Sequence, residues 1–285
     1  MPEPLRPTPQ FADSAAPVSP ESGGTTTPAH PGGEELTAQL GRLVESARDY
    51  AAAYPEAAAV GGWWNARPVT EPPSSPVMRV GEGREAAVLM LFCAGIGDLA
   101  DSGLGAPARF ASDAGPDGPE VLLTERSAGL KKHPGQISFP GGAREESDLD
   151  AAAVALRESQ EEVGLDVDRL TVLGALPPAP VPVSGFMVSP VLAAMQDPGV
   201  LTPQTGEVDR VLRVPVHELV SPRNRCSSAL RRRGVTLKAP AFLLGDTLVW
   251  GFTGILLDRV LNRLGWAQPW DVSREVDPRD YQAFG

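Results

Sequence analysis

Apolar residues along the chain fall into short strand-length runs and two helical stripes. Residues 86–94 are a continuous apolar run, which is typical of a strand buried on both faces. Shorter runs bounded by turn residues predict further strands at residues 120–125, 170–176, 186–193, 208–214 and 248–251. Leucines at helical spacing predict a first helix over residues 34–54. A last amphipathic helix is expected to follow Thr253 as its N-terminal cap.

These predicted elements, together with the composition of the segments around them, divide the chain into four predicted parts. Residues 1–33 are rich in Pro, Ser, Thr and Gly and cannot bury enough apolar surface to offset their ordering entropy, so we expect a disordered N-terminal tail. Residues 34–84 hold the first helix and a Pro-rich linker, and residues 85–265 hold the main domain. Residues 266–285 read as a polar C-terminal tail that is mobile or loosely docked. Strands interspersed with helices predict an α/β domain whose mixed sheet is covered on both faces.

Composition restricts the class of partner. The 285-residue chain has a net charge of −11, which argues against nucleic acid or an anionic membrane as the main partner. It contains no apolar stretch of membrane-spanning length, and its N-terminus lacks a hydrophobic signal core. Cys93, one of two cysteines, lies in an apolar run and is expected to be a buried free thiol. We therefore expect a soluble, cytoplasmic protein. Its oligomeric state stays open, with a homodimer as one alternative.

Three carboxylates crowd the end of a helix predicted to stop at Gly164. Glu158, Glu161 and Glu162 are three and four residues apart, so they share one helical face, where like charges repel. The helix dipole disfavours further anions at that end. A hard divalent cation bound by carboxylate oxygens removes both penalties. The run therefore predicts a site for Mg²⁺ or Mn²⁺, whereas an acidic surface helix is the alternative. An apolar stripe is expected on the opposite face, made by Leu149, Ala152, Ala153, Leu156 and Val163.

The loop before this helix favours the metal site. Its sequence at residues 139–142 is FPGG, and paired glycines let the backbone approach a charged ligand closely. Together with residues 157–164, RESQEEVG, the loop resembles the Nudix box, G-x5-E-x7-R-E-U-x-E-E-x-G-U. Two positions depart from that form. Asp148 stands where the first glutamate is expected, with one extra residue before Arg157, and Ser159 replaces a bulky aliphatic residue.

The upstream segment resembles one subfamily. Residues 122–127, LLTERS, and residues 131–142, KKHPGQISFPGG, are similar to the signature of the Nudix coenzyme A diphosphatases, with Lys131 in place of a second arginine. The combined resemblance spans residues 122–165. It implies an α/β/α sandwich with a mixed β-sheet. It also implies metal-dependent hydrolysis of a phosphoanhydride bond in coenzyme A or acyl-CoA, giving 3′,5′-ADP and 4′-phosphopantetheine.

The metal and catalytic roles follow from this resemblance and from the acidic run. We expect Glu158 and Glu162 to be the first metal ligands, and Glu161 to bind a second ion or act as base. Arg157 is expected to orient an acid through an ion pair. Glu207, at the start of a predicted strand, resembles a later family glutamate and is a second candidate for the general base or an extra ligand.

The substrate-binding residues are expected to lie just upstream. A basic stretch in an acidic chain, comprising Arg126, Lys131, Lys132 and His133, is expected to hold substrate phosphates. Gly141 and Gly142 are expected to line the same site, with their carbonyls completing the metal shell. A second basic run at residues 231–233 reads as a solvated hairpin rather than a phosphate site.

Two alternatives remain at this point. The same chemistry could act on ADP-ribose, a dinucleotide or another nucleoside diphosphate derivative. A Nudix-like module could also sense a nucleotide without cleaving it, although such a module would be expected to lose one of the three carboxylates.

Overall fold

The computed structural model describes residues 33–71, 79–94, 108–109, 118–181, 184–232 and 235–281. The predicted tail, apart from Gly33, and part of the predicted linker lie outside the described residues, as does Arg233 in the second basic run. The helices are α1 (Gly33–Ala53), α2 (Pro55–Ala58), α3 (Ala151–Val163), α4 (Val216–Val220) and α5 (Gly251–Arg263), with short 3-10 turns η1 (Gly62–Trp64), η2 (Val167–Arg169), η3 (Pro222–Asn224) and η4 (Pro278–Asp280).

The strands form two sheets. They are β1 (Arg84–Cys93), β2 (Ala108–Arg109), β3 (Glu120–Arg126), β4 (Ile137–Ser138), β5 (Gly141–Ala143), β6 (Thr171–Ala175), β7 (Ala179–Val181), β8 (Phe186–Met195), β9 (Val208–Pro215), β10 (Arg225–Arg232), β11 (Val235–Leu244), β12 (Thr247–Val249) and β13 (Glu275–Val276). The central sheet has the order β2-β9-β3-β1-β8-β6, with β4, β5 and β7 paired to β3, β1 and β8. β1 runs parallel to β8 and antiparallel to β3, so the sheet is mixed, as predicted.

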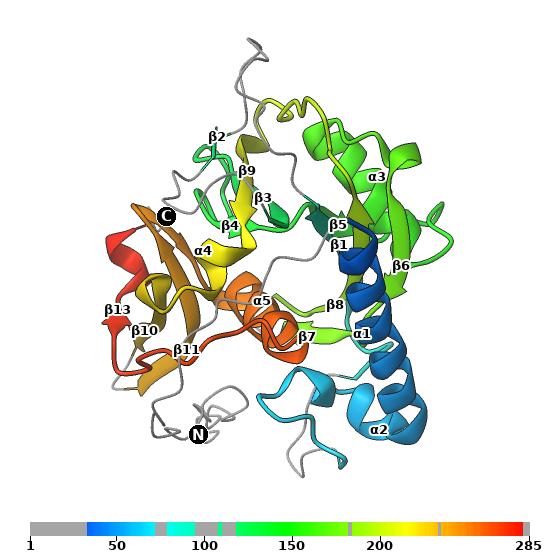
Figure 1. Cartoon of the computed structure of the whole chain (residues 1–285), viewed down its shortest axis with the longest axis horizontal. Helices are drawn as coiled ribbons and strands as arrows, with labels where there is room; N and C mark the ends of the chain where they lie inside the picture. The colour runs from blue at the N-terminus through cyan, green and yellow to red at the C-terminus, as the bar shows by residue number, and fades with distance from the viewer. Residues whose placement is uncertain are drawn as a thin grey trace, which may run out of the picture.

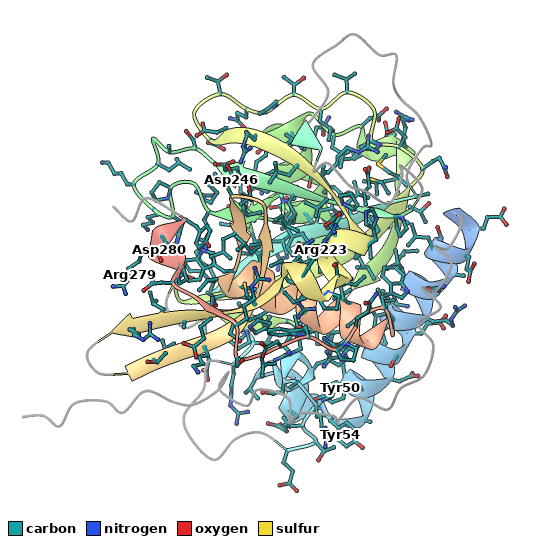
Figure 2. All side chains as sticks on the ribbon, turned by 60° about the vertical axis from the view of Figure 1, so that its left-hand side comes forward. Tyr50, Tyr54, Arg223, Asp246, Arg279 and Asp280 are labelled. Atoms are coloured by element: carbon teal, nitrogen blue, oxygen red, sulfur yellow. The ribbon has the colours of Figure 1, made fainter. Side chains whose placement is uncertain are left out.

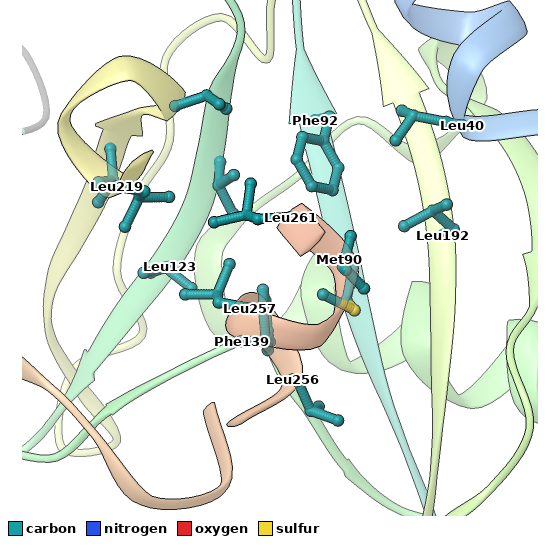
Figure 3. Packing of buried hydrophobic residues seen from close by; sticks show 14 of the residues in the cluster. Leu40, Met90, Phe92, Leu123, Phe139, Leu192, Leu219, Leu256, Leu257 and Leu261 are labelled. Atoms are coloured by element: carbon teal, nitrogen blue, oxygen red, sulfur yellow. The ribbon is translucent and has the colours of Figure 1, made fainter. Parts of the chain in front are cut away.

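Side chains of β1 alternate between the two faces of the sheet. Leu89 and Leu91 pack in the layer beneath α3, whereas Met90 and Phe92 pack on the opposite side with leucines of α1 and α5. Figure 3 shows Leu256, Leu257 and Leu261 of α5 beside Met90 and Phe92. Burying each large apolar side chain contributes about 1.5–3 kcal/mol. Helices therefore cover both faces of a mixed sheet (Figure 1), and the predicted α/β/α sandwich is confirmed.

The segments that flank the predicted main domain also pack on its core. Leu36, Leu40 and Val44 of α1 are buried against the sheet. At the other end, Trp266 packs edge-on against Phe92, and β13 pairs with β10. The final segment is thus docked through its described residues. The division at residues 84 and 265 stays a prediction.

Trp63 and Trp64 lie within the predicted linker. Both indoles are 2% exposed, and Nε1 of Trp64 donates to the carbonyl of Pro177 at 2.6 Å. They therefore belong to the core.

Two local predictions are wrong. Thr253 does not cap α5, because the helix already begins at Gly251. The Thr253 hydroxyl instead donates to the carbonyl of Ile137 at 3.0 Å and ties α5 to β4. Leu149 is 89% exposed, because α3 begins only at Ala151 and the helical projection does not apply to Leu149. Within the described residues, no helix is both long and apolar enough to cross a membrane.

Candidate metal and phosphate site

Helix α3 carries the acidic run and has defined ends. The Asp150 side chain accepts a hydrogen bond from the backbone N–H of Ala153 at 2.8 Å and caps the N-terminus. Gly164 ends the helix with φ +65°, a left-handed conformation that glycine adopts without strain, as predicted. Inside the helix, Ser159 is completely buried and donates its hydroxyl to the carbonyl of Ala155 at 2.6 Å. Because Ser159 is small, α3 can lie close to the sheet.

The three predicted ligands differ in their exposure. Glu162 is 8% exposed and points toward the sheet, where its Oε2 accepts a hydrogen bond from the backbone N–H of Gly141 at 3.1 Å. The Glu158 side chain is 18% exposed, whereas that of Glu161 is 54% exposed. Glu158 and Glu162 therefore form the inner part of the cluster, and Glu161 lies at its rim.

The paired glycines bring the backbone of β5 against these carboxylates. β5 pairs antiparallel with β1, with Gly142 opposite Ala87. A methyl group added at Gly142 would lie 2.3 Å from Oε1 of Glu158, so only glycine leaves room for that carboxylate in its present position. Gly141 has φ +154° and touches the backbone of β1. The sequence therefore placed the two glycines correctly beside the acidic run.

Electrostatics within the cluster favour an added cation. Burial raises the pKa of Glu162 to about 7; the hydrogen bond from Gly141 opposes this shift, and the charges of Glu158 and Glu207 add to it. Burial also raises the pKa of Glu158, against the opposing effect of Arg157. Glu207 is exposed, immediately before β9, and its charge acts on both carboxylates. The structure thus brings Glu207 to the predicted cluster.

Arg157 connects the cluster to a residue whose role the sequence did not reveal. Its Nη1 lies 3.1 Å from Glu158 and 3.2 Å from Glu161, as expected for an orienting cation. Its Nε and Nη2 donate to both carboxylate oxygens of Asp148, which is 6% exposed. These hydrogen bonds lower the pKa of Asp148. The signal was present, since Asp148 occupies the position of the first glutamate of the Nudix box.

The basic stretch forms the loop between β3 and β4. Lys131, Lys132 and His133 are exposed, and His133 adopts φ +55°. Burial, together with the charges of Arg126 and Lys132, lowers the pKa of His133. The charge of Arg126 also lowers the pKa of Glu162. The buried Nε of Arg126 has no hydrogen-bond partner in the described part of the chain.

This loop is fixed to the start of β9. The backbone N–H of Ser127 donates to the carbonyl of Glu207 at 2.8 Å, and that of Ala128 donates to Asp209 at 2.8 Å. Glu207 and the basic loop therefore keep a defined relation to each other. Asp209 was not singled out from the sequence, because a carboxylate in a turn carries no signal of its distant backbone partner.

The donor set can be compared with the needs of a metal ion. In the described residues, no three His, Cys, Asp or Glu side chains are grouped closely enough to hold one. Instead, the Arg157 guanidinium contacts Glu158 and Glu161, and Glu162 bonds to Gly141. The chemistry nevertheless fits a hard cation: the ligands are carboxylates, the pKa values of two of them are raised, and the glycine backbone leaves space beside Glu158.

Comparisons with known proteins cover this region. The NUDIX domain family model matches residues 110–231, which include every candidate site residue. An uncharacterized Nudix hydrolase NudL of Pectobacterium atrosepticum is 34% identical over 142 residues, covering 50% of this chain and 73% of the relative. The corresponding uncharacterized NudL of Escherichia coli K12 is 33% identical over 147 residues, covering 52% and 76%.

Solved structures of similar proteins are more distant. The Nudix hydrolase RenU of M. smegmatis is 22% identical, with a TM-score of 0.35, and the match covers 50% of this chain and 77% of that one. The family assignment rests instead on the domain match, on relatives above 30% identity that the chain covers over more than two thirds of their length, and on the acidic helix beside its glycine strand. The chain belongs to the Nudix hydrolase family.

Proposed function

We propose that this protein hydrolyses the phosphoanhydride bond of coenzyme A or acyl-CoA in a reaction that depends on Mg²⁺ or Mn²⁺. Nudix hydrolases act on phosphoanhydride bonds of nucleoside diphosphate derivatives and generally use such ions. The observation that carries the proposal is the placement of Glu158 and Glu162, the inner part of the cluster, against the Gly141–Gly142 backbone, with the charge of Arg126 acting on Glu162.

Glu158 and Glu162 are the proposed first ligands, with Glu161 at the rim for a second ion. A bound divalent ion would neutralise diphosphate charge and lower the pKa of a water molecule. For the cation to bind, the Nη1 contacts of Arg157 with Glu158 and Glu161 must loosen. The bonds of Arg157 to Asp148 keep the guanidinium close and limit how far the carboxylates can move.

The proton acceptor is proposed to be Glu161 or Glu207. Both side chains are exposed, so either carboxylate can contact an attacking water molecule without a change in its own burial. Glu207 lies where the basic loop joins β9, and its carbonyl is held by Ser127. The backbone bond to Ser127 and the effect of the Glu207 charge on Glu158 and Glu162 support this candidate base.

The basic loop provides the proposed selectivity for coenzyme A. Coenzyme A carries a 3′-phosphate in addition to its diphosphate, and a guanidinium can bind phosphate through two hydrogen bonds. Arg126 has an unused buried Nε, and Lys131, Lys132 and His133 lie exposed on the same loop. Two separate phosphate groups therefore suit this loop better than a single diphosphate does.

The proposal is tested by incubating purified protein with coenzyme A, dephospho-coenzyme A, ADP-ribose and NADH, each with Mg²⁺ or Mn²⁺, and identifying the products by mass. We expect coenzyme A to give 3′,5′-ADP and 4′-phosphopantetheine at the highest kcat/KM. A higher kcat/KM for ADP-ribose or NADH would replace the substrate assignment. Binding without cleavage of any compound would indicate a sensing module.

The role of the loop has its own test. Arg126→Ala should raise the KM for coenzyme A more than the KM for dephospho-coenzyme A. The matched control is Arg210→Ala, because Arg210 lies on neighbouring β9 and pairs with Glu125 rather than with the site. Equal effects of Arg126→Ala on both substrates would reject 3′-phosphate recognition.

A further inference from the structure

A cavity lies between α1, α4 and the C-terminal end of α5. Its volume is about 960 Å³, which is within the range of small-molecule sites. Figure 2 labels two of its lining residues, Tyr50 on α1 and Arg223 just after α4. The cavity contains none of the residues assigned above to the metal and phosphate site.

The cavity is separated from that site by the length of two paired strands. Pro119 and Val216 line the cavity, and they flank the end of the β3–β9 pair at which Glu120 lies opposite Pro215. At the other end, Arg126 lies opposite Val208, next to Glu207. A seven-residue strand such as β3 spans roughly 20 Å at about 3.3 Å per residue. A ligand in the cavity would therefore not touch the carboxylates.

Positive charge is in excess along one wall. Asp258 forms ion pairs with both Arg225 and Arg259, and Arg263 follows one helical turn after Arg259. Arg263 lines the cavity, but in the described residues no carboxylate lies within 4.0 Å of it. Among the residues that line the cavity, Arg42, Arg223 and Arg263 are cations and Glu35 is the carboxylate, so positive charge is in excess there.

Arg263 is held in place by neutral partners. Its guanidinium stacks on Trp63 with its centre 4.0 Å from the ring centroid and donates to the carbonyls of Trp63 and Asn65. Burial and the charge of Arg259 lower the pKa of Arg263 to about 10, so it remains a cation at neutral pH. Arg42, on α1, lines the same cavity and has no ion pair in the described residues.

The remaining walls combine polar and apolar side chains. Leu43, Val220 and Leu264 line the cavity together with the ring of Trp266, whose Nε1 is occupied by Gln39 at 2.8 Å. We propose that this cavity binds a small organic anion, with the anionic group against Arg263 and Arg42 and an apolar body against Leu43, Val220 and Trp266. An anion there supplies the missing counter-charge, and the apolar walls favour a ligand with a hydrophobic part.

The test uses 8-anilinonaphthalene-1-sulfonate, an anion with an aromatic body, titrated into the full chain by fluorescence and calorimetry. We expect one saturable site. Arg42→Glu should weaken binding by about tenfold or more, as expected for loss of a charge-assisted contact. Arg48→Glu is the matched control, because Arg48 lies on the same helix but beside Gly174, outside the cavity.

A second variant blocks the cavity without touching a cation. Ser46 is exposed and lines the cavity, so Ser46→Trp should fill it and abolish saturable binding, whereas Glu45→Trp on the same turn should not. Saturable binding that is unchanged in both Arg42→Glu and Ser46→Trp would overturn the proposal, as would its absence in the unmodified protein. The titration uses no substrate, so its outcome is independent of the hydrolysis test.

Discussion

Arg157 and Asp148 form a two-bond ion pair directly behind the carboxylate cluster. Nε of Arg157 donates to Oδ1 at 3.1 Å, and Nη2 donates to Oδ2 at 3.0 Å. The third nitrogen of the same guanidinium contacts Glu158 and Glu161. The position of the arginine, and through it that of two proposed ligands, therefore depends on a carboxylate outside α3.

We expect Asp148→Ala to lower turnover by about 10- to 100-fold, the range found when a residue supporting a metal ligand is removed. The apparent affinity for Mg²⁺ should also change, because the guanidinium of Arg157, which contacts Glu158 and Glu161, would no longer be fixed by Asp148. Steady-state kinetics at varied Mg²⁺ measures both effects. Asp150→Ala is the control. It removes the α3 cap and should cost about 1 kcal/mol of stability without affecting the site. Equal losses of turnover in the two variants would contradict this role.

Gly142→Ala should impair turnover while leaving the fold intact. The new methyl group would meet the end of the Glu158 side chain, which can rotate away, so the protein should fold with that carboxylate displaced. Comparing kcat and the unfolding midpoint separates the two effects. Gly41→Ala, on α1 and outside the site, is the control, because an added methyl group there meets nothing within 4 Å. Normal turnover in Gly142→Ala would show that Glu158 need not stay beside β5.

The raised pKa of Glu162 predicts a pH-dependent stability of the metal-free protein. Its pKa is about 7 in the folded state, against an ordinary value of 4.5. Between these two values the folded state binds more protons than the unfolded state, so stability falls as pH rises through this window. The contribution amounts to at most about 3 kcal/mol. It should appear in urea unfolding with EDTA and disappear in Glu162→Gln. Similar pH profiles for the two proteins would refute it.

Features of the site that depend on residues close together in the sequence were predicted, whereas features that depend on distant contacts were not. The spacing of Glu158, Glu161 and Glu162 and the adjacent glycines are local patterns, and the structure brings these residues together. Their unequal burial was not predictable, because it depends on how α3 is rotated against the sheet. The bonds of Arg157 to Asp148 cross nine residues and require the loop conformation.

The second sheet, which contains β10 and β11, shows that prediction of the fold from the sequence is limited in the same way. The hairpin expected at residues 231–233 corresponds to the antiparallel pair β10 and β11, but the sequence did not predict the length of these strands or the separate sheet that they form. Arg225 is fully buried between the rings of Phe242 and Trp270 and pairs with Asp258, 33 residues away. Arginine is rarely fully buried, so its burial here is not expected from the sequence alone. Only the tertiary fold supplies its partners.

Both cysteines should be unreactive in the native protein. Cys93 is 1% exposed and Cys226 is fully buried, and burial raises the pKa of Cys93 to about 12. Ellman's reagent should therefore label neither thiol in the folded protein and both after unfolding in guanidinium chloride. Rapid labelling of one native thiol would require local opening around β1 or β10.

Ending the chain at residue 265 should destabilise the protein strongly. This change removes the hydrogen bond of Trp266 to Gln39, the ring of Trp270 over Arg225, and the bond from Ser227 to the carbonyl of Val272 at 2.7 Å. We expect the melting midpoint to fall by about 10 °C or more, at roughly 2–4 °C per kcal/mol. Scanning calorimetry measures it.

Removal of residues 1–32 provides the comparison at the other terminus. Composition predicts that this deletion leaves both the melting midpoint and the activity nearly unchanged. A large loss on this deletion, or an unchanged midpoint after the C-terminal truncation, would contradict the respective prediction.

The complete burial of Ser159 has a consequence for how this enzyme can vary. Ser159 is completely buried one turn before Val163, which packs in the core layer beneath α3. A bulky aliphatic residue here would lift the helix and carry both carboxylates outward with it. The size of the side chain at position 159 would therefore change how deeply the acidic cluster lies, while every charged residue stays the same.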